Sequence, residues 1–321
     1  MKMPEAGACG RAAVLVATLA SAFFLGGCGS LPDAKPFADA TGALSASAKA
    51  SGQALTDSLR EAATVLPDDR SAYERNIASF DTGWSVRTRA LQGAADYSNA
   101  IAELISASDK SGETAAKVAG SLSALANAFG VPIAGAAASV TTDIGRFVWQ
   151  RISIVKASRS LEQAMLEAQP AVDAMAQQLI VDGDQRLKPA LTAIHKNILS
   201  GIRGRYDADA NLAAAFDQRQ KLLRQQALKD SRHLGELQQF ERVKTSLDAR
   251  MAERDARLEQ AAAAYRTRLQ LINALSVAVQ SWAHAHRDLA LAVKEKRKVS
   301  VAELTETTLE LRELIKKVRA L

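Results

Sequence analysis

The fold is decided by residues 251–293, MAERDARLEQAAAAYRTRLQLINALSVAVQSWAHAHRDLALAV. One row of side chains recurs there every seven residues: Met251, Leu258, Tyr265, Ile272, Val279, His286 and Val293. A second row of mostly small side chains lies four positions behind it: Ala262, Leu269, Ser276, Ala283 and Ala290. A sustained seven-residue repeat is typical of a coiled-coil seam. We expect one helix from about Gly235 to Lys298, roughly 95 Å long at about 1.5 Å per residue.

The composition extends this helical prediction to the whole chain. Of the 321 residues, 48% are hydrophobic and only 5% are aromatic, and the dominant types are those that favour helices. Few segments show the alternation of β-branched and polar residues that marks a strand. We therefore predict an all-α fold, an elongated helical bundle with long antiparallel coiled-coil helices in the C-terminal half. Ser300 and Glu303 have the spacing of a capping box, so a last helix should begin there and fold back on the long one.

The first half of the chain is also expected to be helical. A helix of low hydrophobicity should cover residues 37–65, and core side chains three or four positions apart predict a second over residues 71–107. Pro170 indicates either a kink or a new helix start, and Pro189 another start. Residues 182–184, Asp-Gly-Asp, are interpreted as a turn, because the Glu that a calcium loop needs at position twelve is missing.

Residues 118–142 form the longest uncharged run after the N-terminal region. Gly130 fits a helix end and Pro132 a helix start, so the run predicts a tightly packed hairpin. Its small residues suit either the centre of a bundle or a hairpin that inserts into a membrane. In layout the run resembles the insertion segment of helical pore-forming toxins, although it shares no motif with them. The low apolar content, with Asn127 near the middle, favours the buried interpretation.

The N-terminus has the layout of a secretory signal. Lys2 and Arg11 precede an uncharged run from Ala12 to Phe24, which is too short to span a bilayer that needs about 20 apolar residues. The following residues 25–28, Leu-Gly-Gly-Cys, resemble the lipobox of bacterial lipoproteins. The resemblance covers residues 1–28 only.

This resemblance implies cleavage before Cys28, attachment of a diacylglycerol to its thiol, and usually acylation of the freed amine. In that family an Asp directly after the cysteine retains the lipoprotein in the inner membrane of many bacteria. Residue 29 is Gly, so the resemblance implies an outer-membrane anchor that faces the periplasm. The other cysteine, Cys9, lies in the segment that would be removed, so the mature chain should contain no disulfide. We divide the chain into a signal peptide (1–27), a flexible tether (28–36), an Ala-rich helical bundle (37–205) and long charged coiled-coil helices that pack on it (206–321).

The sequence offers little for catalysis. It contains no Gly-x-Ser-x-Gly elbow and no Gly-rich phosphate loop. His284 and His286 lie two positions apart, which points them in different directions on a helix, and His195 and His233 have no partner at ligand spacing. We predict no catalytic residues, no metal site, no cofactor and no enzymatic activity.

Positive charge gathers in the last third of the chain. Residues 201–321 hold 23 Lys and Arg against 16 Asp and Glu, a net charge of +7, and the excess is greatest at Lys294, Lys296, Arg297 and Lys298. These cations could complement the dipole of a helix end, or meet anionic lipid, acidic wall polymer or an acidic protein. We do not expect nucleic acid as a partner, because no nucleic-acid motif accompanies the basic residues.

The sequence thus favours a non-catalytic envelope lipoprotein, a lipid-tethered scaffold that binds a protein or the cell wall. The alternative is a membrane-perturbing protein that uses residues 118–142. An enzyme whose site is assembled from distant residues is the third hypothesis. The oligomeric state and the partner's identity are left open.

Overall fold

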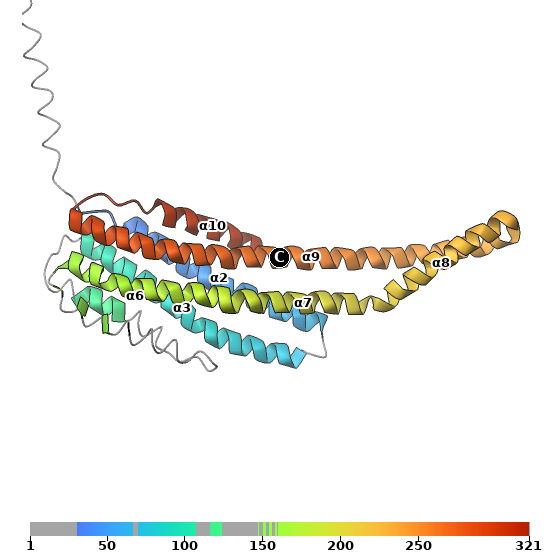
Figure 1. The fold of residues 1–321 in the computed structure, drawn as a ribbon, viewed down its shortest axis with the longest axis horizontal. Coiled ribbons are helices and arrows are strands. Elements are labelled where there is room, and N and C mark those ends of the chain that lie inside the picture. Colours follow the sequence, from blue (N-terminus) through green and yellow to red (C-terminus); the bar gives the residue numbers. More distant parts are fainter. Residues whose placement is uncertain are drawn as a thin grey trace, which may run out of the picture.

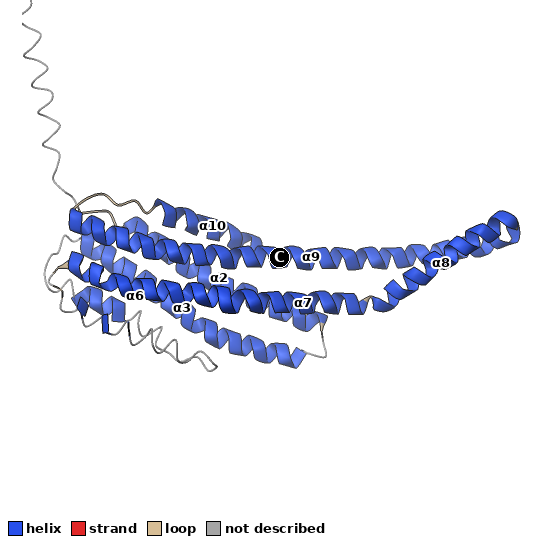
Figure 2. Cartoon of the chain, in the orientation of Figure 1, coloured by secondary structure: helices blue, strands red, loops and turns tan. Residues whose placement is uncertain are grey.

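The structure, a computed structural model, describes residues 31–66, 70–106, 116–123 and 160–320, together with isolated positions between 147 and 158. The described chain forms an elongated all-α bundle, which confirms the predicted fold class (Figures 1 and 2). Its labelled helices are α2 (Lys35–Val65), α3 (Arg70–Ser106), α6 (Leu161–Asp182), α7 (Lys188–Arg205), α8 (Asp207–Lys229), α9 (Leu234–Glu295) and α10 (Ala302–Arg319).

Helix α2 is a central helix of the bundle, although it is rich in Ala and Ser. It contacts α3, α7, α9 and α10. Four of its buried hydroxyl groups donate hydrogen bonds to the carbonyl four residues earlier, and those of Ser45 and Thr56 donate to side chains of α3, so their burial leaves no hydroxyl unpaired. The side chain of Trp84 in α3 lies directly over Gly52, and its indole N–H donates to the Ala48 carbonyl at 3.0 Å. Small side chains therefore place this helix at the centre, because neighbours can approach it closely.

Helix α2 also corrects one boundary. The predicted tether of residues 28–36 is shorter at its described end, because α2 already begins at Lys35 and Ala34 is only 2% exposed. Pro36 lies in the first turn of the helix, where its missing N–H leaves no hydrogen bond unmade.

Helix α9 is the long helix that the seven-residue repeat predicted. It contains 62 residues, which corresponds to about 93 Å, and Ile272, Val279 and His286 of the predicted row are at most 1% exposed. The second row is broader than expected. Side chains three positions after the first row are buried as well as those four positions after it: Trp282 and Leu289 are at most 1% exposed, and Ala290 is 0% exposed. The difference arises because α9 packs against α2, α6, α7 and α10 at once, so it buries more than a two-helix seam.

Residues 182–184 do not form the predicted turn. Helices α6 and α7 are joined by a π-helical segment, Gly183–Leu187, into one continuous rod in which Pro170 lies inside α6 and Pro189 at the start of α7. Asp182 is 3% exposed and accepts a hydrogen bond from Arg87 of α3 at 2.7 Å. Because this ion pair and the packing of Leu187 draw the segment into the core, the helix widens here and does not turn out to solvent.

Helix α10 folds back on α9, as predicted, but without the capping box. The N-cap is Val301, one residue later than predicted, so Glu303 is not at the position that would reach back to the cap. Its carboxylate instead accepts from the Ser281 hydroxyl of α9 at 2.8 Å, which ties the two helices together.

Most of the uncharged run lies outside the described residues, including Gly130 and Pro132. Its described part, 118–123, lies in a helical stretch over 116–123, and Val118, Ala119 and Leu122 are fully buried in the main core. This part of the run therefore belongs to the bundle.

Candidate functional site

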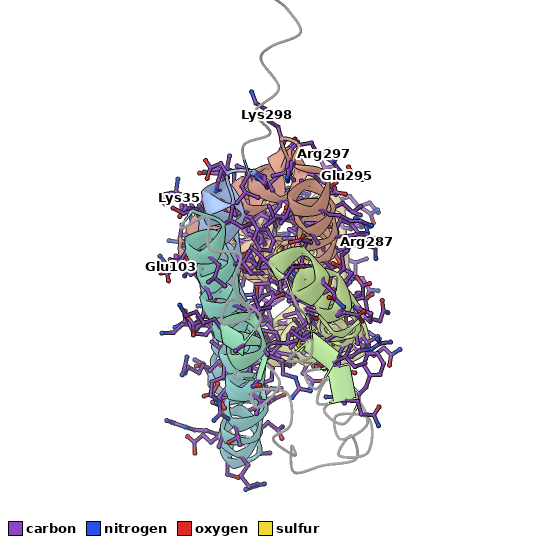
Figure 3. All side chains as sticks on the ribbon, turned by 90° about the vertical axis from the view of Figure 1, so that its left-hand side faces the viewer. Lys35, Glu103, Arg287, Glu295, Arg297 and Lys298 are labelled. Atoms are coloured by element: carbon purple, nitrogen blue, oxygen red, sulfur yellow. The ribbon has the colours of Figure 1, made fainter. Side chains whose placement is uncertain are left out.

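The predicted lipid site, Cys28, lies outside the described residues. The structure does show where the chain that follows it enters the fold. Leu31 packs against the main core, and Lys35 begins α2 at one end of the bundle. Figure 3 looks onto this end and shows Lys35, Arg297 and Lys298 on it. The chain after the predicted lipid site and the basic residues after α9 thus share one end of the molecule.

The basic residues form an exposed turn that we call the basic turn, residues 294–298. Helix α9 stops at Glu295, and Lys296 adopts φ 52° and ψ 47°, a left-handed conformation usually taken by Gly or Asn. The Arg297 guanidinium pairs with Glu295 at 2.6 Å. Lys294, Lys296 and Lys298 have no acidic partner in the described part of the chain. Three cations therefore point to solvent without a partner at the end of the bundle.

At the opposite end, α8 and the first part of α9 form a two-helix stalk, residues 207–260, which extends beyond the other helices (Figure 1). Phe216 and Phe240 stack across the stalk with ring centroids 4.4 Å apart, and ion pairs such as Arg219–Glu236 at 2.9 Å flank this seam. Leu223 is fully buried in the stalk but belongs to neither core cluster of the bundle. The stalk therefore holds itself together as an antiparallel coiled coil.

The tip of the stalk is basic and partly apolar. Residues 218–245 hold seven Lys and Arg against three Asp and Glu, a net charge of +4. Leu228 is 88% exposed and Leu234 is 48% exposed on either side of the turn Ser231–His233. Exposed leucines beside cations are suited to contact with another molecule, and they lie at the end opposite to Lys35.

A buried polar chain crosses the bundle at His286. The Tyr97 hydroxyl lies 2.8 Å from Nε2 of His286, and Nδ1 lies 2.6 Å from Oε1 of Gln169. The Gln169 amide group then donates to the Ala283 carbonyl at 3.1 Å and to Asp173 at 2.8 Å. These distances fit one neutral tautomer, in which Nδ1–H donates to Gln169 and Nε2 accepts from Tyr97.

Burial has the largest effect on the pKa values of these hydrogen-bonded side chains. It lowers the pKa of His286 to about 4, and it raises the pKa of Tyr97 far above its usual value. Both side chains are fully buried. These hydrogen bonds therefore join α3, α6 and α9 inside the core.

The other histidines are also accounted for by structure. His284 is exposed while His286 is buried, which confirms that they point in different directions. His195 stacks on Tyr265 with centroids 4.3 Å apart, and partial burial lowers its pKa. For His233 the sequence interpretation was wrong, because an acidic side chain, Glu236, lies 3.6 Å from it at the stalk tip. Across the described ranges there is no group of three or more His, Cys, Asp or Glu side chains that could hold a metal ion.

The sequence interpretation missed two features of these sites. The left-handed Lys296 carries no sequence signal, because Gly or Asn would be expected there. The partner of His286 was also missed, since Tyr97 is 189 positions away in the chain. Its place in the apolar row was the one available sign of burial.

Among the helices described, none is long and apolar enough to cross a membrane. Comparison with known protein families, with curated proteins and with solved structures found no match.

Proposed function

We propose that this protein is a non-catalytic lipoprotein of the bacterial cell envelope, anchored through a lipid on Cys28 and acting as a scaffold or binding partner in the periplasm. Its bundle would stand on the membrane and carry the stalk toward a protein or cell-wall partner. The lipobox-like residues 25–28 support the anchor. Gly29 favours the outer membrane by the same resemblance.

The observation that carries the proposal is that the stalk tip lies at the opposite end of the molecule from the chain that follows Cys28. Leu31 is three residues after Cys28, and a chain of that length reaches at most about 10 Å. An anchor on Cys28 would therefore hold the end with Lys35 close to the bilayer, while the stalk tip would lie at the far end of a helix of about 93 Å. A tethered rod of this kind presents its tip to partners away from the membrane.

The membrane-perturbing alternative rests on residues 118–142. In the described part of that run, 118–123, the side chains of Val118, Ala119 and Leu122 pack in the core, and release of the run would break this packing. This favours the scaffold. Dye release from neutral vesicles by the full chain, lost in an Ala124→Glu variant that remains folded, would support the alternative.

The anchor is tested by mass spectrometry of the membrane-bound protein from bacterial cells. We expect a mature chain that begins at Cys28 and carries a diacylglycerol and an acyl group. Cys28→Ser should remain uncleaved and unlipidated, whereas the matched variant Cys9→Ser should be processed normally because Cys9 lies upstream of the cleavage site. An unmodified Cys28 in the membrane-bound wild-type protein would overturn the proposal.

A further inference from the structure

We propose that the basic turn is a docking surface for anionic phospholipid headgroups, which sets the bundle upright on the membrane. The choice of ligand rests on the proposed function, because the chain after Cys28 enters the fold at this end. The turn carries four cations against one acid in residues 294–298, a net charge of +3, and all five residues are exposed.

Lys35, at the start of α2, lies at the same end of the bundle as the basic turn. The Lys35 ammonium is paired with Asp39 at 2.8 Å, and its backbone N–H donates to Asp33 at 2.9 Å. Lys35 therefore adds little net charge, and the unpaired cations are those of the basic turn. Figure 3 shows Lys298 at the rim of this end, directed away from the body of the bundle.

The need to end a helix does not explain the turn. A cation at position 294 would complement the dipole of α9, but Lys296 and Lys298 lie beyond the last helical residue. Lys296 also occupies a left-handed conformation that a glycine adopts more easily. A chain that only required a helix stop would be served better by glycine, so the lysine points to a use for its charge.

Phospholipid headgroups fit this arrangement. Lysine ammonium groups bind phosphates as compact point charges, and each cation near an anionic bilayer strengthens binding by about fivefold. Three unpaired lysines together should strengthen it by about 100-fold. The lipid on Cys28 would hold the turn within reach of the headgroups, so that two contacts fix the direction of the rod.

The test uses the chain from residue 29 onward, without signal peptide or lipid. Both core clusters are formed by residues from 34 onward, and circular dichroism checks that each variant melts as the parent does. Binding is measured by sedimentation with vesicles of phosphatidylglycerol and phosphatidylcholine in equal parts, and with pure phosphatidylcholine. We expect binding to the anionic vesicles only, with strong weakening by salt.

The decisive variant combines Lys294→Gln, Lys296→Asn and Lys298→Gln, where Asn is chosen because it tolerates the left-handed conformation. We expect its partition coefficient on anionic vesicles to fall by about 100-fold. No binding of the parent chain to anionic vesicles would overturn the proposal and would leave an acidic protein or wall polymer as the partner of the turn.

A matched control removes the same charge from the other end. Lys221→Gln, Lys229→Gln and Arg242→Gln remove three cations of the stalk that form no ion pair within the described part of the chain, and this variant should bind as the parent does. Equal losses in both triple variants would show attraction to net charge alone, and a loss only in the stalk variant would assign the membrane contact to the tip. Either result overturns the proposal. Because the chain tested begins at residue 29 and carries no lipid, the result of the vesicle-binding experiment is independent of whether Cys28 is modified.

Discussion

Acid should weaken the fold through His286, and the structure gives the size of the effect. The ordinary pKa of a histidine is 6.5, and burial lowers that of His286 to about 4 in the folded protein. Above pH 6.5 the imidazole is neutral in both states and contributes no pH dependence. Below pH 6.5 the imidazole becomes protonated in the unfolded protein but stays neutral in the folded protein until the pH approaches 4. The free energy of unfolding therefore falls by about 2 kcal/mol at pH 5 and about 3 kcal/mol at pH 4.

Charged neighbours do not reverse this sign. Asp173 favours the protonated imidazole and Arg287 opposes it, but both effects are smaller than burial. Arg287 also pairs with Asp173 at 2.9 Å, which partly cancels the two charges. The proton is therefore excluded mainly because the imidazolium would lose its hydration inside the core.

The assay is urea unfolding between pH 7.5 and pH 4.5, followed by circular dichroism. His286→Phe keeps a ring in the site and should remove the His286 part of the slope, although it also costs stability by leaving Tyr97 and Gln169 with an unpaired group each. The matched control is His284→Gln, whose exposed side chain lies two positions away. An NMR titration of the wild-type imidazole measures the same quantity without a variant. A His286 pKa near 6.5, or an unchanged slope in His286→Phe, would refute the reasoning.

Three further predictions concern packing. Gly52→Ala would place a methyl group 1.9 Å from a tryptophan ring of α3 and should destabilise the fold by about 1–3 kcal/mol. Gly42→Ala in the same helix has open space around the new methyl group and should stabilise the fold by about 0.5–1 kcal/mol. Thermal melting distinguishes the two variants. Leu223→Asp should speed hydrogen exchange across the stalk while exchange in the bundle is unchanged. The control Leu222→Asp, at a side chain that is 53% exposed, should leave exchange unchanged in both the stalk and the bundle. Ile272→Asp should cost about 4 kcal/mol or more, and an unchanged melting temperature would contradict its burial in the core.

The sequence predicted the long helices well because their signal is local. The seven-residue row from Met251 to Val293 required only that apolar side chains of one helix face one side, and α9 meets this condition. The turn at residues 182–184 was predicted wrongly because Asp-Gly-Asp usually prefers a loop. Here Arg87, which lies 95 positions away, supplies the partner that keeps Asp182 in the core, and no local pattern contains that information.

The centre of the bundle was hard to predict for a related reason. Helix α2 is rich in Ala and Ser, which resembles an exposed or weakly packed helix in composition. Its burial follows from close approach of neighbours, as at Gly52 under Trp84, and this depends on the shapes of several helices together. The basic turn was identified as a cluster of charges, but its place at the same end of the bundle as Lys35 required the fold.

A core lined with small side chains needs something to fix how its helices align. Alanine and serine surfaces are nearly alike at successive turns, so they distinguish less than large side chains do between alignments that differ by one turn, about 5.4 Å. The same shift would separate His286 from Tyr97 and Gln169, and Arg87 from Asp182, and each buried group left without a partner costs about 1–3 kcal/mol, more for the charged pair. The Arg87–Asp182 pair joins α3 to α6, and the contacts of His286 join both of these helices to α9. They therefore specify one alignment of the helices, and a fixed alignment is what allows the bundle to hold the basic turn and the stalk at opposite ends of one rigid rod.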